Sequence, residues 1–231
     1  MEKYLTIYHG SNKIIENPSF GLGKKNNDFG LGFYCTENND LAKEWAVNSL
    51  ENGYSNEYKL NIEYLKVLNL NTNEYSILNW IAILVEHRLF SIDTPIAKRA
   101  RRYLIENFSI NVNAYDVIIG YRADDSYFDY AEAFLNNSIS VSQLANAMRL
   151  GKLGEQIVIK SEYAFKCLEY VGYEIALKDV YYEKRVERNN IANISYQKMI
   201  EKEDIEGLYI RDIIKGDIKN DDSRIPRMLS K

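Results

Sequence analysis

Two short segments near the N-terminus place an imidazole, a phenol and several glycines at a spacing suited to a flat, charged ligand. Residues 8–11 (YHGS) close an apolar run that begins at Tyr4, and residues 28–36 (DFGLGFYCT) follow about twenty residues later. A histidine at the end of a strand can aim an N–H at a ribose hydroxyl, while the next glycine lets bare backbone approach the ligand. Tyr34 can offer a ring face to an aromatic cation, and Trp45 can offer a second one.

Each of these features also has a purely structural interpretation. His9 could be a hydrogen-bonded histidine at a strand end, and Tyr34 and Trp45 could be core residues. Residues 21–32 contain four glycines, but a stretch rich in lysine and asparagine separates them into two pairs. They therefore do not form the strand-GxGxxG-helix unit that binds a pyrophosphate, and a Rossmann fold is not expected.

Length and composition predict one globular domain. The chain has 231 residues, of which 46% are hydrophobic. Its formal net charge of −4 argues against a positive potential over the whole surface that would bind nucleic acid. The start lacks the pattern of a signal peptide and no run reaches the roughly 18 apolar residues of a membrane span, so we expect a cytoplasmic protein without membrane contact. Cys35 and Cys167 fit neither a disulfide framework nor a zinc site, and no metal is expected.

The hydrophobic periodicity predicts an α+β fold. Strands are expected at 4–8, 33–36, 116–120 and 155–160, with a strand pair or one bulged strand at 58–70. Helices are expected after the capping residues 37–40, at 77–89, at 95–107, after 124–125, at 141–150 and at 162–170, with one or two peripheral helices from 174 onward. Strands scattered among helices favour a split antiparallel sheet in a single domain over residues 1–216, followed by a polar, frayed tail at 217–231.

Four segments together carry a resemblance to a known family. Residues 8–11 (YHGS), 29–34 (FGLGFY), 42–45 (AKEW) and 154–158 (GEQIV) resemble the histidine-tyrosine-glutamate pattern of the diphtheria-toxin and poly(ADP-ribose)-polymerase branch of ADP-ribosyltransferases. The chain looks most like a bacterial family of uncharacterised ADP-ribosyltransferase-like proteins, some of which are encoded beside small partners in toxin-antitoxin-like pairs. The resemblance is specific over residues 4–46, fair over 153–170 and weak elsewhere. It implies a split antiparallel sheet with inserted and peripheral helices, and NAD as a substrate that needs no metal.

The resemblance also assigns roles to individual residues. It implies that His9 hydrogen-bonds the adenosine-ribose hydroxyls of NAD and that the backbone of Gly10 holds the nicotinamide carboxamide. Tyr34 would stack on the nicotinamide ring. Trp45 falls where the polymerases place a second stacking tyrosine, and an indole can replace it because its π-face is larger.

Two positions depart from the family pattern. Ala42 falls where the polymerases place a serine that also binds the carboxamide, so Ser11 or Thr36 would have to supply that contact. Glu155 precedes its strand much as the catalytic glutamate does in the polymerases. Because side chains alternate along a strand, a slip of one residue would turn Gln156 toward the site instead. We favour Glu155, since a carboxylate is the better partner for the cation that forms when the glycosidic bond breaks; a glutamine would keep the hydrogen bond but favour single transfer over chain elongation.

The resemblance implies a mono-ADP-ribosyltransferase that modifies a protein or nucleic-acid acceptor inside a bacterial cell, as the toxin of a toxin-antitoxin-like pair. Two alternatives stay open: an NAD glycohydrolase, and an inactive module that binds NAD or a partner. The basic cluster at 98–102 (KRARR) could meet the NAD phosphates, a nucleic acid or an acidic partner, but a solvated helix face is the favoured interpretation.

Overall fold

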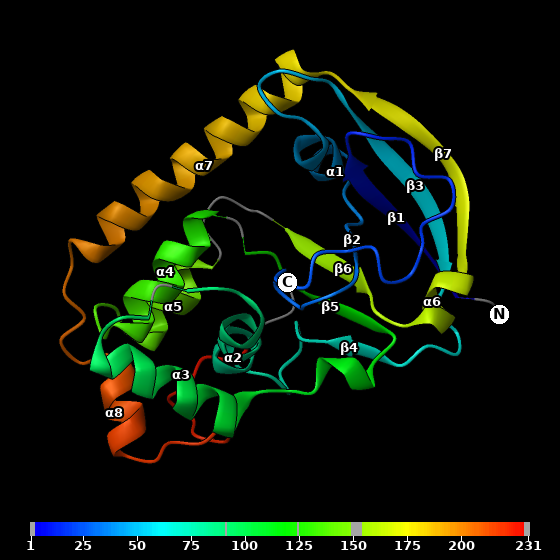
Figure 1. Cartoon of the computed structure of the whole chain (residues 1–231). Coiled ribbons are helices and arrows are strands. Elements are labelled where there is room, and N and C mark those ends of the chain that lie inside the picture. The colour runs from blue at the N-terminus through cyan, green and yellow to red at the C-terminus, as the bar shows by residue number, and fades with distance from the viewer. Residues whose placement is uncertain (1–2, 91, 124, 149–153, 229–231) are drawn as a thin grey trace.

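The computed structural model describes residues 3–90, 92–123, 125–148 and 154–228. In these residues the protein is a mixed α+β structure in which two small β-sheets lie beside a group of helices (Figure 1). The expected α+β class is therefore confirmed.

The sheets divide the strands into an antiparallel set and a mixed set. The first sheet has the order β1-β3-β7 and is antiparallel throughout, with β1 at Tyr4–Ser11, β3 at Gly53–Asn61 and β7 at Leu168–Ala176. The second has the order β2-β6-β5-β4, with β2 at Phe33–Cys35, β6 at Glu155–Ile159, β5 at Val117–Tyr121 and β4 at Val67–Asn69. In the second sheet β4 and β5 are parallel and the other neighbours are antiparallel. An isolated bridge between Tyr8 and Thr36, with backbone hydrogen bonds of 2.8 and 2.9 Å, links β1 to the end of β2.

The two sheets share a small core, and the helices build a larger one. Ile7 and Tyr58 of the first sheet are fully buried against Val117 and Ile157 of the second. The larger core surrounds α2 (Ile77–His87), whose residues from Ile77 to Val85 are all buried, as expected for a helix that is apolar all round. The helices around it are α3 (Pro95–Phe108), α4 (Asp125–Leu135), α5 (Val141–Ala147) and α8 (Ile210–Lys215), with a 3-10 turn at Val112–Ala114.

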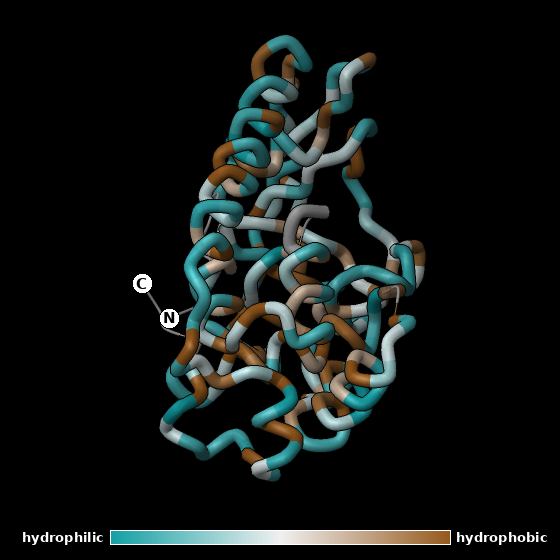
Figure 2. Tube along the Cα trace, turned by 90° about the vertical axis from the view of Figure 1, so that its left-hand side faces the viewer, coloured by the Kyte–Doolittle hydropathy of each residue, from teal (hydrophilic) through white to brown (hydrophobic). Residues whose placement is uncertain are grey.

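A long helix joins the two halves of the molecule. After β7, α7 (Lys178–Ile200) runs past α1 (Asn39–Ala46) and reaches α4 and α5 (Figure 1). In the view of Figure 2 this helix faces the viewer, and apolar residues recur along it among hydrophilic ones. Val186, Ile191 and Ile194 are exposed on it. None of the helices in the described residues is long and apolar enough to cross a bilayer.

Three predicted features differ in the structure. The helix expected at 162–170 begins where predicted but is too long in the prediction, because α6 spans only Glu162–Lys166 and the chain then enters β7, which pairs with β3. The segment 58–70 belongs to two strands, β3 and β4, that lie in different sheets. The C-terminal segment does not fray over residues 217–228, since Ile218, Ile225 and Met228 are buried in the larger core.

Candidate functional site

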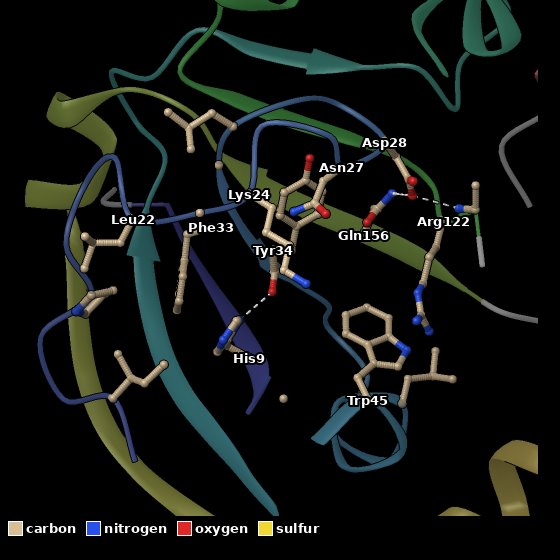
Figure 3. Close-up of a pocket in the computed structure, with 18 of the residues that line it drawn as sticks. His9, Leu22, Lys24, Asn27, Asp28, Phe33, Tyr34, Trp45, Arg122 and Gln156 are labelled. Carbon is tan, nitrogen blue, oxygen red and sulfur yellow. Dashed lines mark hydrogen bonds between the residues drawn. The ribbon is translucent and has the colours of Figure 1, made fainter. Parts of the chain in front are cut away.

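A cavity of about 750 Å³ lies where the end of β1, the loop before β2, α1, β6 and α7 approach one another (Figure 3). Of the residues expected to bind a ligand, His9, Gly10, Tyr34, Trp45 and Gln156 line it. These five residues come from segments far apart in the sequence. The sequence-based expectation that they meet at one place agrees with this geometry.

His9 is held in one tautomer and faces the cavity. Its Nδ1 lies 2.7 Å from the backbone oxygen of Tyr34, and because a carbonyl only accepts, Nδ1 carries the hydrogen (Figure 3). Burial lowers the pKa of His9 below its ordinary value, which favours the neutral ring. Nε2 of that neutral ring is an acceptor, so it can accept a hydrogen bond from a hydroxyl. The N–H that was expected to face a ligand hydroxyl is donated to Tyr34 instead. The imidazole also stacks on Phe33, with the ring centroids 4.2 Å apart.

Gly10 brings the backbone of β1 into direct contact with α1. A Cβ at this position would lie 2.0 Å from the carbonyl oxygen of Ala42 and 2.9 Å from the amide nitrogen of Ala46. The helix is fixed there because the side chain of Asn38 accepts from the amide of Leu41 at 3.1 Å and so caps its first turn. This close packing explains both the glycine and the small residues that α1 presents to it.

Tyr34 exposes a ring face to the cavity and uses its hydroxyl for structure. The hydroxyl donates to the backbone oxygen of Gly30 at 2.6 Å and accepts from the amide of Phe29 at 3.1 Å. Gly30 has a φ of +73°, a conformation that favours glycine, so the turn closes on the phenol. Burial raises the pKa of Tyr34, and the hydroxyl stays protonated. The ring therefore offers a stacking surface rather than an acid or a base.

Trp45 carries a cation over its ring. The guanidinium of Arg122 lies 4.6 Å from the centroid of the indole, within the range of a cation–π contact. Arg122 follows β5 and also lines the cavity. Trp45 is thus well placed to meet a ligand ring, but a guanidinium already covers part of its surface.

The structure corrects the expectation for β6. Gln156, which is 3% exposed, lines the cavity, whereas Glu155 does not line it and pairs with Tyr121 at the start of the strand. The preference for Glu155 as the residue that faces the site was wrong in register by one residue. The amide of Gln156 donates to Asp28 at 2.8 Å and to the backbone oxygen of Tyr121 at 3.2 Å.

Neither of the two side chains suggested as a replacement for the missing serine lines the cavity. Ser11 is partly buried at the end of β1 and accepts from the amide of Lys13 at 3.2 Å. Thr36 is buried and accepts from the amide of Asn38 at 3.2 Å, just before α1. Both hydroxyls serve local turns, because each begins or ends an element.

Comparison with known proteins gives one match. A family model described as a protein of unknown function, DUF3990, covers residues 5–170. The chain belongs to this family. Neither the curated proteins nor the solved structures contain a match. The DUF3990 region contains His9, Tyr34, Trp45 and Gln156, whereas α7 lies beyond it.

Several residues at the DUF3990 cavity were not singled out by sequence reasoning. Asp28 begins the turn that Tyr34 closes, so its place next to a motif was a usable signal. Arg185 and Arg188 come from α7, which reaches the cavity only through the tertiary fold. The basic cluster at 98–102 lies instead on α3 and does not line the cavity; one of its members, Arg101, donates to the backbone oxygen of Val85 at 3.0 Å.

Proposed function

We propose that this DUF3990 protein binds NAD in the cavity and transfers its ADP-ribose to a protein or nucleic-acid acceptor. One observation carries the proposal: His9, Tyr34 and Trp45, to which the resemblance gives roles in NAD binding, line the same cavity. The volume of about 750 Å³ lies within the range of roughly 300–1,000 Å³ typical of small-molecule and cofactor sites.

The charge of the cavity supports an anionic ligand. Its described lining includes five cationic side chains and two carboxylates, although the whole chain has a net charge of −4. The cations are Lys24, Arg88, Arg122, Arg185 and Arg188, and the carboxylates are Asp28 and Glu44. A local excess of cations on an acidic protein favours a pyrophosphate such as that of NAD.

The proposed reaction breaks the bond between nicotinamide and ribose. Positive charge then develops on the ribose. A hydrogen-bond acceptor placed at a ribose hydroxyl stabilises this charged transition state more than it stabilises intact NAD. The amide oxygen of Gln156 would accept a hydrogen bond from that hydroxyl, and it carries no charge. A hydrogen bond to a neutral group contributes about 1 kcal/mol against roughly 1.5–3 kcal/mol for a charged one, so we expect slow, single transfer rather than chain elongation.

The decisive experiment is incubation of the purified protein with NAD labelled in its adenylate phosphate, together with bacterial lysate or nucleic acid. We expect nicotinamide release and labelled macromolecule. His9→Ala should lower both strongly, because it removes the hydroxyl acceptor and the link to Tyr34. Ser11→Ala, a small change at a partly buried residue outside the cavity, is the matched control and should have no effect. Absence of both NAD binding and nicotinamide release would contradict the proposal.

A second candidate function is a module that binds NAD without consuming it. It is favoured by Gln156, since an amide gives the developing cation less stabilisation than a carboxylate does. NAD binding without nicotinamide release would support this candidate. Release of free ADP-ribose without labelled macromolecule would instead indicate a glycohydrolase. We further propose that expression in bacteria slows growth through the same site, as a partner-restrained toxin would, and that His9→Ala abolishes the effect.

A further inference from the structure

Asp28 is a buried carboxylate at the edge of the cavity with its charge only partly offset. Its residue is 5% exposed, and Oδ2 accepts from the amide of Ala123 at 2.9 Å and from Nε2 of Gln156 at 2.8 Å. Oδ1 lies 3.6 Å from Nη1 of Arg88 and makes no hydrogen bond within the part of the chain that the structure describes. Burying a carboxylate in this way is costly, and a nonpolar side chain could fill the space at lower cost.

The contact with Asp28 decides which end of the Gln156 amide faces the cavity. Nε2 has two acceptors, the Asp28 carboxylate and the backbone oxygen of Tyr121. Burial raises the pKa of Asp28, while the hydrogen bonds from Ala123 and Gln156 and the charge of Arg88 lower it and favour the carboxylate. Neither this carboxylate nor the backbone oxygen can donate a hydrogen bond, so the amide cannot turn over without placing its oxygen against an oxygen. Figure 3 shows the oxygen of Gln156 on the side away from Asp28. The side chain therefore presents a fixed acceptor, Oε1, to the cavity.

We propose that Asp28 is a positioning residue that makes Gln156 the acceptor for a hydroxyl on the nicotinamide ribose of NAD. The inference rests on the proposed function. The carboxylate fixes the orientation of the amide, and hydrogen bonds in series polarise one another, which increases the negative charge on Oε1. The pair thereby supplies part of the electrostatic effect that a carboxylate at position 156 would give directly.

The test compares NAD with an analogue that lacks the 2′-hydroxyl of the nicotinamide ribose. In the wild type, removal of this hydroxyl should weaken calorimetric binding about tenfold, the value of one good hydrogen bond. In Asp28→Leu the same removal should cost less than about threefold, because Gln156 then loses the carboxylate that orients and polarises its amide and keeps only the backbone oxygen of Tyr121 as an acceptor. An analogue that lacks the 2′-hydroxyl of the adenosine ribose is the matched control, and its penalty should be the same in both proteins.

A second variant keeps Asp28 in place. Gln156→Met removes the acceptor but retains the volume, so the penalty for the nicotinamide-ribose hydroxyl should disappear there as well, whether or not Asp28→Leu folds. If Asp28 has a purely structural role, its substitution should weaken the binding of NAD and of both analogues by the same factor. The penalty for removing the nicotinamide-ribose hydroxyl would then be unchanged, and this result would contradict the inference. A penalty that persists in Gln156→Met also contradicts it. A wild type that does not bind NAD contradicts the proposed function itself, and the inference fails with it.

An exchange of groups provides an independent check on the pair. Gln156→Glu alone places two carboxylates against each other and should weaken NAD binding through repulsion. Asp28→Asn combined with Gln156→Glu restores a donor facing an acceptor, and we expect NAD affinity to recover to within about threefold of the wild type. Losses that simply add in the double variant would show that the two side chains do not act together.

Discussion

Gly10 is the position at which the backbone leaves no room for a side chain. We predict that Gly10→Ala lowers the free energy of unfolding by at least about 2 kcal/mol, because its Cβ would lie 2.0 Å from the carbonyl oxygen of Ala42. Chemical denaturation measures this loss. Gly172→Ala is the matched control on another strand, since nothing lies within 4 Å of the added Cβ, and its effect should stay within about 0.5 kcal/mol. Equal effects would show that β1 and α1 are not packed as closely as the structure indicates.

His9 should make the stability of the protein dependent on pH below neutrality. Burial lowers its pKa in the folded state below the ordinary value of 6.5, so the unfolded chain takes up the proton first. The contribution of His9 to the free energy of unfolding is complete above pH 6.5 and is lost as the pH falls through its pKa in the folded state. The free energy of unfolding should fall by no more than about 1.4 kcal/mol per pH unit in this range.

The measurement is the free energy of unfolding of the wild type minus that of His9→Gln, from pH 7.5 to pH 5. We expect this difference to fall as the pH falls. His87 has a lowered pKa too, but it is present in both proteins and cancels in the difference. A difference that is constant across the range would mean that His9 is not buried in its neutral form.

At the level of elements, a buried ion pair connects α7 to α1. Arg188 donates to both carboxylate oxygens of Glu44 at 2.8 and 3.0 Å, and the Glu44 side chain is only 2% exposed. We predict that Arg188→Met costs about 3–5 kcal/mol of unfolding free energy, because it leaves a buried carboxylate without its cation. Adding Glu44→Gln to that variant should recover most of the loss, as thermal or chemical denaturation would show.

The control for this prediction lies on the same helix. Lys184 pairs with Asp40 at 3.5 Å, and both side chains are about half exposed. Lys184→Met should therefore cost no more than about 1 kcal/mol. If the two methionine variants are equally stable, the pair between Arg188 and Glu44 does not hold α7 in place.

The elements that the sequence predicted well carry their own local signals. The stripe of apolar residues fixed α2 to within two residues, and Pro95 in the first turn located the start of α3. No comparable signal marks β7. Its apolar residues suit a helix as well as a strand, and only pairing with β3, more than one hundred residues earlier in the chain, decides between the two.

The candidate site divides in the same way. His9 and Tyr34 could be found from the sequence because glycines lie near them, although only Gly30 marks a turn, and Gly10 instead lets β1 pack against α1. The choice between Glu155 and Gln156 could not be made from the sequence, since the residues of one strand do not show which of its two faces is turned toward the site. Asp28 lies beside the motif that contains Tyr34, but its contact with Gln156 joins remote segments, as does the contact of Arg188 with Glu44, and no local pattern identifies such contacts.

Across the whole molecule, the cavity lies between parts that contact one another at few points. The two sheets meet through the bridge at Tyr8 and Thr36 and through one small core, while α7 connects β7 to the helical half. A ligand in the cavity would touch β1, α1, β6 and α7 together. Binding of this kind stabilises the native arrangement of all four elements, because the unfolded chain has no such site.

Hydrogen exchange should locate this stabilisation. With NAD at about one hundred times its dissociation constant, the native state gains about 2.7 kcal/mol, and amides that exchange through separation of these elements should slow accordingly. We expect slower exchange in α1, in β6 and in the part of α7 that carries Arg185 and Arg188. Local exchange in α3 and α8 should change less, because these helices do not line the cavity. Protection confined to α3 and α8, or none at all, would show that NAD does not bind between the sheets and α7, and that α7 only supports the fold.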